Sequence, residues 1–217
     1  MKRLLFAGTC VVVVLGFVLA ASWFKDRRAE QLGSMAQENV STFVRPHSPA
    51  YGPEDAKVVI VEFTDPACET CAAFSPIVKR FMDAHPGKIR LVVRYAPFHE
   101  GADLAIRVVE AAKVQGRFWE TLELLYRNQH VWTRHHQVLP DRMWMLLSES
   151  GLDLERLRED LANPRIETIL RQDLADAATL GVRKTPGFFV NGKPLEPFGE
   201  APLAALIEAE VRSRYPE

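Results

Sequence analysis

Two cysteines, Cys68 and Cys71, stand three positions apart, directly after a run rich in valine and isoleucine. A pair with this spacing can be half of a zinc site, a structural disulfide or a redox-active centre. A disulfide that closes so short a loop restricts the unfolded chain very little, so it would add little stability. A zinc site needs more ligands, and the histidines lie far from the pair in the sequence. We therefore favour a redox centre that exchanges thiols and disulfides over a metal site.

The composition limits the class of protein. The 217 residues are enough for one domain with a buried core, and 47% hydrophobic with 25% charged residues is typical of a globular chain. The 27 lysines and arginines are balanced by 28 aspartates and glutamates, so the charge predicts no nucleic-acid partner. The chain has three cysteines, which excludes a four-cysteine zinc site within one chain. One of them, Cys10, lies in an N-terminal apolar stretch.

Residues 1–24 are predicted to be a membrane anchor or a signal peptide. Lys2 and Arg3 precede an uncharged stretch from Leu4 to Phe24, which is long enough to span a bilayer as a helix of about 20 residues. Small residues at 20–22 also permit signal cleavage. We favour an uncleaved anchor, and on either interpretation the domain is extracytoplasmic, for example periplasmic, where disulfides form. Residues 25–50 are polar and predict a tether with a lead-in segment.

The elements that position the cysteines follow from the pattern of the chain. Strands are predicted at 57–63, 89–95, 187–190 and 193–195, and helices at about 68–85, 102–115, 118–128, 140–150, 154–161, 165–180 and 200–214. The order is strand–helix–strand, a helical block over about 101–180, and strand–strand–helix, within one domain at 51–217. Pro76 falls inside the first helix and should kink it. Trp119, Trp132 and Trp144 are expected in the core of the helical block.

Cys68 falls where the first strand passes into a helix. A thiolate at a helix N-terminus is stabilised by free amide groups and by the positive end of the helix dipole, which lowers its pKa. Cys71 lies one turn further into the helix and is therefore more shielded. Thr185 and Pro186 stand just before the strand that follows the helical block. We expect a cis-proline facing the cysteines there, with the residue before it free to pair its backbone with an extended substrate.

Together these features resemble the DsbA-like branch of the thioredoxin superfamily, which are extracytoplasmic thiol–disulfide oxidoreductases. The resemblance covers about 48–214 and rests on SPAYGPEDAKVVIVEFTDPACETC, on Pro76, on the helical block and on GVRKTPGFFVNGKPL. It implies an α/β, thioredoxin-like fold in which a helical insertion separates the βαβ and ββα halves. It also implies protein thiols or disulfides as substrates, and neither an organic cofactor nor a metal.

The resemblance implies a role for each matching residue. Cys68 corresponds to the cysteine that forms mixed disulfides, and Cys71 to its resolving partner. Pro186 matches the cis-proline, and Thr185 the residue that contacts the substrate backbone. Glu62 matches an acidic residue beneath the active site that accepts or relays a proton. Its burial in a sheet should raise its pKa, whereas the alternative is a carboxylate at a strand end with a lysine partner.

Between the cysteines the chain departs from the strongly oxidising members of the family. Those members usually carry Pro-His, where this chain has Glu69 and Thr70, which we group with Thr185 as substrate-binding candidates. A histidine there supports the thiolate, whereas a nearby glutamate opposes it, so oxidase, reductase and isomerase all stay open. The implied recycling partner is a membrane redox protein, quinone-linked for an oxidase and a conduit for thiol reductant for a reductase.

Two other classes of protein fit the same cysteine pair. One is a binding or chaperone module without catalysis, and the other is a metal-handling protein, for instance in copper tolerance. His130, His135 and His136 form a cluster of histidines without nearby cysteines, and we interpret them as solvated loop residues. His99 follows the second strand, either as a turn residue, which we favour, or near the active-site end of the sheet.

Overall fold

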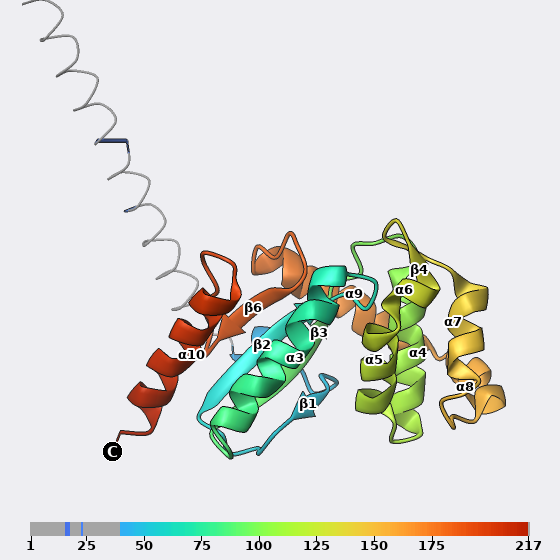
Figure 1. Ribbon diagram of the computed structural model, residues 1–217, viewed down its shortest axis with the longest axis horizontal. Helices are drawn as coiled ribbons and strands as arrows, with labels where there is room; N and C mark the ends of the chain where they lie inside the picture. The colour runs from blue at the N-terminus through green and yellow to red at the C-terminus, as the bar shows by residue number, and fades with distance from the viewer. Residues whose placement is uncertain (1–15, 18–22, 24–39, 217) are drawn as a thin grey trace, which may run out of the picture.

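The computed structural model describes residues 16, 17, 23 and 40–216 (Figure 1). Apart from residues 16, 17 and 23, the predicted anchor or signal peptide lies outside the described residues, and so does most of the predicted tether. Within the described part, no helix is both long and apolar enough to cross a membrane.

A five-stranded sheet lies at the centre of the fold. Its strands are β1 (Ala50–Tyr51), β2 (Val58–Thr64), β3 (Ile89–Tyr95), β6 (Gly187–Val190) and β7 (Lys193–Pro194). Their order across the sheet is β1-β3-β2-β6-β7. The central strand β2 runs parallel to β3 and antiparallel to β6, and β1 and β7 pair antiparallel at the edges. Because β2 is covered on both faces, its sequence VVIVEFT is almost continuously apolar.

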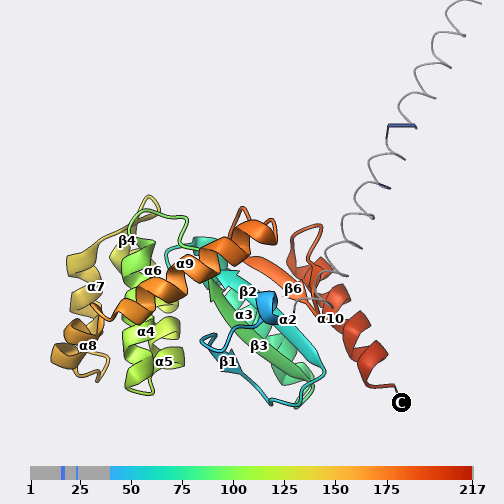
Figure 2. The same cartoon turned by 180° about the vertical axis from the view of Figure 1, so that it is seen from behind.

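Helices cover both faces of this sheet. One face is covered by α3 (Glu69–Ala84) and α10 (Glu200–Arg214), and the other by α2 (Val40–Phe43) and α9 (Pro164–Thr179), as Figures 1 and 2 show from opposite sides. Alternate residues of β2 enter the two layers: Ile60 packs in the core under α3 and α10, whereas Val61 packs in the core under α9. Pro76 lies inside α3, as the sequence predicted.

The helical insertion forms a second lobe beside the sheet (Figure 1). It contains α4 (Ala102–Val114), α5 (Phe118–Arg127), α6 (Gln129–Trp132), the hairpin of β4 (Thr133–Arg134) and β5 (Gln137–Val138), α7 (Pro140–Leu147) and α8 (Leu154–Asp160), before α9 returns to the sheet. Trp132 is fully buried in its core, and Trp119 and Trp144 are partly buried against it. The predicted thioredoxin-like fold with a helical insertion between βαβ and ββα halves is confirmed. The sequence did not predict α6 or the β4–β5 hairpin.

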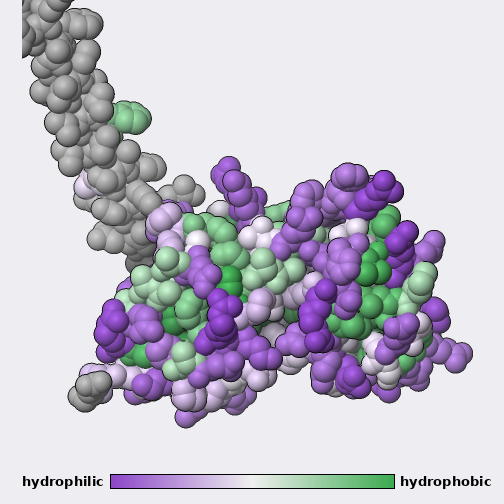
Figure 3. Space-filling view, in the orientation of Figure 1, coloured by the Kyte–Doolittle hydropathy of each residue, from purple (hydrophilic) through white to green (hydrophobic). Residues whose placement is uncertain are grey.

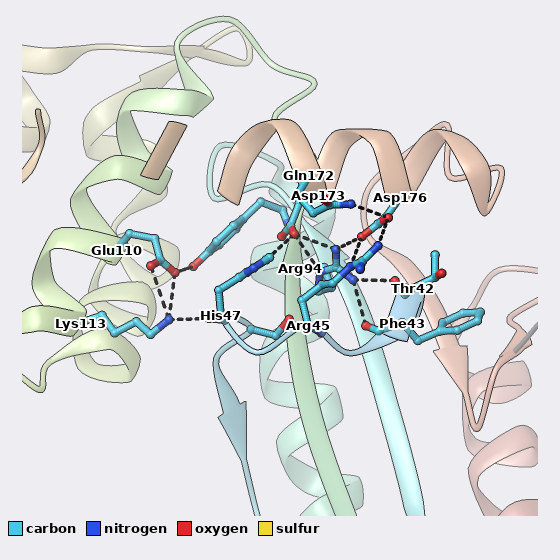
Figure 4. Close-up of polar contacts among 12 residues, drawn as sticks. Thr42, Phe43, Arg45, His47, Arg94, Glu110, Lys113, Gln172, Asp173 and Asp176 are labelled. Carbon is cyan, nitrogen blue, oxygen red and sulfur yellow. Dashed lines mark hydrogen bonds and ion pairs between the residues drawn. The ribbon is translucent and has the colours of Figure 1, made fainter. Parts of the chain in front are cut away.

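The last part of the lead-in segment is bound to the fold by a buried charge network (Figure 4). Arg94 of β3 is fully buried, and its Nη2 lies 2.7 Å from Asp173 Oδ1 and 2.5 Å from Asp176 Oδ2. Two lead-in residues bind the same carboxylates: Arg45 Nη2 lies 2.7 Å from Asp176 Oδ1, and His47 Nε2 lies 2.7 Å from Asp173 Oδ1. The network therefore fixes where the chain enters the domain, on the α9 face of the sheet.

Candidate functional site

The N-terminus of α3 is held in place by a buried carboxylate. Asp65, directly after β2, accepts from the Ala67 amide at 2.8 Å through Oδ1. Its Oδ2 accepts from the amides of Phe98 at 2.8 Å and His99 at 3.0 Å, and from His99 Nδ1 at 2.8 Å. One side chain thus joins the loop after β2 to the loop after β3. This fixes the position of Cys68, the residue that precedes the first turn of α3.

Cys68 is only 5% exposed, and its Sγ lies 3.2 Å from the carbonyl oxygen of Thr185. Its pKa is lowered to about 5, first because the Cys71 thiol donates a hydrogen bond to it. The Thr185 side chain and the amides of Thr70 and Cys71 also support the thiolate, and burial opposes them. The contact with the Thr185 carbonyl favours the protonated thiol, but the several donors at the helix N-terminus outweigh it.

Cys71 has the opposite character. Its side chain is fully buried, and its pKa is raised well above the ordinary value, first by that burial. The hydrogen bond to Cys68 and the charges of Glu62 and Cys68 add to this effect. Both cysteines are reduced in the structure. The pair therefore combines one thiol that ionises readily with one that keeps its proton.

Glu62 lies in the middle of β2, behind the two cysteines. It is 4% exposed, and burial raises its pKa to about 7, with a smaller contribution from the charge of Cys68. Its Oε1 has no hydrogen-bond partner within the described part of the chain. It borders a cavity of about 270 Å³ between α3 and α5, with Trp119 and Tyr126 among the other walls. In Figure 3 the surface is hollowed between the two lobes on this side.

The peptide bond between Thr185 and Pro186 is cis. These residues border a groove of about 530 Å³ that runs from Thr70 along β6 to Phe198. Phe198 is half exposed and packs against Phe74 of α3, with ring centroids 4.7 Å apart. The groove thus offers backbone and an aromatic side chain next to the redox pair.

A second hollow, of about 330 Å³, adjoins this groove and lies in front of Cys68. It is lined by Cys68, Glu69, Thr70, Phe98, His99, His136, Arg183, Lys184 and Thr185. Glu69 and Thr70 are exposed on the first turn of α3. His99 therefore lies at the active-site end of the sheet, which was the less favoured of the two interpretations of its position.

The structure brings together all seven residues singled out from the sequence. Glu62, Cys68, Glu69, Thr70, Cys71, Thr185 and Pro186 lie on β2, on the start of α3 and on the loop before β6. Sequence reasoning did not single out Asp65. His136, interpreted from the sequence as a solvated loop residue, is exposed in the turn of the β4–β5 hairpin and also lines the hollow at Cys68. In the described ranges, no group of three or more His, Cys, Asp or Glu residues is placed to hold a metal ion.

Comparison with known proteins supports this picture. A family model described as thioredoxin matches residues 45–209. The solved structure of a thioredoxin-like oxidoreductase from Silicibacter pomeroyi is 29% identical and superimposes with a TM-score of 0.69, covering 80% of this chain and 96% of that one. The thiol–disulfide exchange protein alpha-DsbA2 from Wolbachia pipientis is 17% identical, with a TM-score of 0.70 over 84% of this chain and 97% of that one.

A curated relative of a different kind also matches. A protein named Na(+)/H(+) antiporter NhaA, from Herminiimonas arsenicoxydans, is 36% identical over 166 residues, which are 74% of this chain and 25% of that protein. Further antiporters of that name match over up to 33% of their length. The chain thus spans about a quarter to a third of the curated relatives that it matches.

Proposed function

Because the chain belongs to the thioredoxin family and has the fold of its DsbA-like members, we propose that it exchanges disulfides with protein substrates through Cys68 and Cys71. One observation carries this proposal: the two neighbouring thiols have pKa values shifted in opposite directions, to about 5 for Cys68 and well above the ordinary value for Cys71. A structural disulfide does not require two thiols of different acidity. A redox pair needs it, because one sulfur must leave or attack as a thiolate and the other must wait in its protonated form.

The chemistry runs in either direction with the same atoms. When the protein oxidises, a substrate thiolate attacks Cys68 Sγ, the Cys68–Cys71 bond breaks, and its electron pair stays on Cys71. A second substrate thiol then releases Cys68 as a stabilised thiolate. When the protein reduces, Cys68 attacks a substrate disulfide and Cys71 resolves the mixed disulfide. We propose that Glu62 supplies or accepts the proton of Cys71, because the charge of Glu62 acts on that thiol.

The pKa of Cys68 bears on the direction of electron flow. A value of about 5 lies between those of strong oxidants, about 3.5, and thioredoxin, about 7. At pH 7 it favours the reduced protein by about a hundredfold over a thiol of ordinary pKa, which corresponds to about 60 mV. We therefore propose a reduction potential between about −120 mV, as in strong oxidants, and about −270 mV, as in thioredoxin.

We propose that substrates bind as extended segments across Thr185 and Pro186. The groove there presents backbone to pair with and Phe198 to contact an apolar side chain. The exchange would take place outside the cytoplasm, with residues 1–24 as the membrane anchor or export signal. A membrane redox protein would recycle the pair, through a quinone for an oxidase or as a thiol conduit for a reductase.

The test is the equilibrium of the Cys68–Cys71 pair with glutathione, read by mass spectrometry after acid quenching. We expect one disulfide per chain and a potential between the two limits above. Cys68→Ser should abolish exchange with a dithiol peptide, and Cys71→Ser should trap mixed disulfides. If a variant in which Cys68 and Cys71 are both serine keeps its full activity in cells, the protein is instead a binding or chaperone module. Stoichiometric copper held by the reduced protein at sub-micromolar affinity would indicate metal handling.

A further inference from the structure

The hollow in front of Cys68 contains an oriented histidine. His99 Nδ1 lies 2.8 Å from Asp65 Oδ2, and a carboxylate can only accept hydrogen bonds, so Nδ1 carries the proton. In the neutral ring, Nε2 is then the unprotonated nitrogen. The ring side chain is 23% exposed, whereas Asp65 is fully buried. A buried carboxylate thus fixes both the tautomer and the orientation of a partly exposed imidazole.

A second histidine packs against the first. The rings of His99 and His136 stack with centroids 5.3 Å apart. His136 lies in the tight turn of the β4–β5 hairpin, where His135 and His136 both have positive φ, 50° and 63°. A two-residue hairpin turn of this kind requires positive φ at both central residues, which residues other than glycine, asparagine and aspartate rarely adopt. The helical insertion therefore contributes one wall of the hollow and packs against the His99 ring.

Thiol–disulfide exchange moves protons at two sulfur atoms, that of Cys71 and that of the substrate. Glu62 is buried and lines the cavity between α3 and α5, whereas it is not among the residues that line the hollow at Cys68. Among the residues around the front hollow, Arg183 and Lys184 have side chains that donate hydrogen bonds and do not accept them. Glu69 is an exposed carboxylate on the first turn of α3. Histidine is the side chain suited to that transfer near pH 7.

We propose that His99, oriented by Asp65, is the general base and acid for the substrate sulfur that reacts at Cys68. In oxidation, the substrate S–H gives its proton to His99 Nε2 while its sulfur bonds to Cys68 Sγ. The Cys68–Cys71 bond breaks at the same time, and its electron pair goes to Cys71. In reduction, Cys68 displaces the substrate sulfur, which takes the proton back from His99. This inference rests on the proposed function and names a catalytic residue that the cysteine motif does not contain.

The size of the effect follows from the ionisation of the substrate. An ordinary cysteine has a pKa of about 8.5, so at pH 7 only about one in 30 is a thiolate. A base that removes this limitation accelerates oxidation at pH 7 by at most about 30-fold, and by only about twofold at pH 8.5. A purely structural role of His99 would change the rate equally at every pH. The charged and titratable groups around His99 are Asp65, Cys68, Glu69, Glu100, His136, Arg183 and Lys184.

The decisive variant is His99→Asn, because its amide can still donate to Asp65 but offers no base to the hollow. We would measure the second-order rate constant for oxidation of a dithiol peptide by the oxidised protein from pH 6 to 9. The expected loss is up to about 30-fold at pH 7, falling toward twofold at pH 8.5. The matched control, His136→Asn, removes the stacked ring without touching Asp65 and should lose much less. Free imidazole should restore part of the rate of His99→Ala.

Two further measurements separate the possible failures. With an aromatic thiol that is ionised over the whole pH range, His99→Asn should react like the wild type. The alkylation midpoint of Cys68 should also stay the same; a rise would mean that His99 supports the Cys68 thiolate, which overturns the proposal. A loss of oxidation rate in His99→Asn that is equal at all pH values also overturns the proposal. If the wild-type protein shows no exchange that depends on Cys68, the proposed function fails instead.

Discussion

Replacing the buried carboxyl of Glu62 by an amide should stabilise the protein, by an amount that grows as the pH rises from about 4.5 to about 7 and stays constant above that. The pKa of Glu62 is raised from 4.5 to about 7, first because the side chain is buried in the sheet. A shift of about 2.5 units corresponds to about 3 kcal/mol at 1.36 kcal/mol per unit. Because the folded pKa is the higher one, this contribution to stability is fully present below pH 4.5 and is lost as the pH rises through 7. The Glu62→Gln variant has no charge to bury, so it does not lose stability as the pH rises.

The cysteines must be removed from this experiment because Cys68 has the opposite dependence. Its pKa is lowered from 9.0 to about 5, so the stability that it contributes is present above pH 9 and is lost as the pH falls through 5. In the reduced protein the two effects oppose each other between about pH 5 and pH 7. We would therefore compare Glu62→Gln with its parent in a background where Cys68 and Cys71 are both serine. Burial, the main cause of the Glu62 shift, is unchanged there.

The assay is urea unfolding followed by tryptophan fluorescence, at pH values from 4.5 to 8.5. The variant and its parent should be equally stable at pH 4.5, and the variant should be more stable by about 3 kcal/mol at pH 8.5. Glu123→Gln is the matched control, since Glu123 borders the same cavity but is 46% exposed and paired with Lys79. It should show no such trend. A difference between Glu62→Gln and its parent that stays constant with pH would refute the reasoning.

The remaining predictions concern the thiolate and the charge network. Iodoacetamide alkylation of the reduced protein, read by mass spectrometry, should give Cys68 a midpoint near pH 5, and a midpoint above 8 would contradict its helix-terminal stabilisation. Thr185→Val should raise that midpoint by about one unit, because a hydrogen bond to a charged group contributes about 1.5–3 kcal/mol. Arg94→Met should lower the free energy of unfolding by about 3–5 kcal/mol, since it leaves two buried carboxylates without their shared donor. Arg45→Met, which changes a partly exposed pair, should cost about 1 kcal/mol in the same urea experiment, and equal costs would argue against the central place of Arg94.

The order of the main elements could be predicted because each has a local signal. Runs of β-branched residues mark β2 and β3, glycine and proline end the helices, and the periodicity of apolar residues marks the inserted helices. The β4–β5 hairpin could not be predicted. Its turn carries His135 and His136 where asparagine and glycine are usual, so the packing of the insertion, not local preference, decides that conformation.

The redox pair could also be predicted, but its surroundings could not. The cysteine spacing and the strand before it place Cys68 at a helix N-terminus, which is a local relation. Asp65 and His99 are 34 residues apart, and their contact depends on how two loops meet at one edge of the sheet. Arg94 illustrates the same limit. An arginine in a strand normally faces solvent, and its burial here depends on the two aspartates of α9 and on the carbonyl oxygens of Thr42 and Phe43.

Glu69 and Thr70 are not among the residues that we propose to transfer protons. Both are exposed on the first turn of α3, whereas Glu62 lies behind the pair and His99 is held by another loop. Glu69→His should therefore lower the Cys68 pKa, and each unit would make the protein more oxidising by about 30 mV, measured against glutathione. The pH dependence of substrate oxidation should keep its shape, because the groups proposed to move protons are untouched. A variant with an unchanged potential would show that the residues between the cysteines do not set the direction of electron flow.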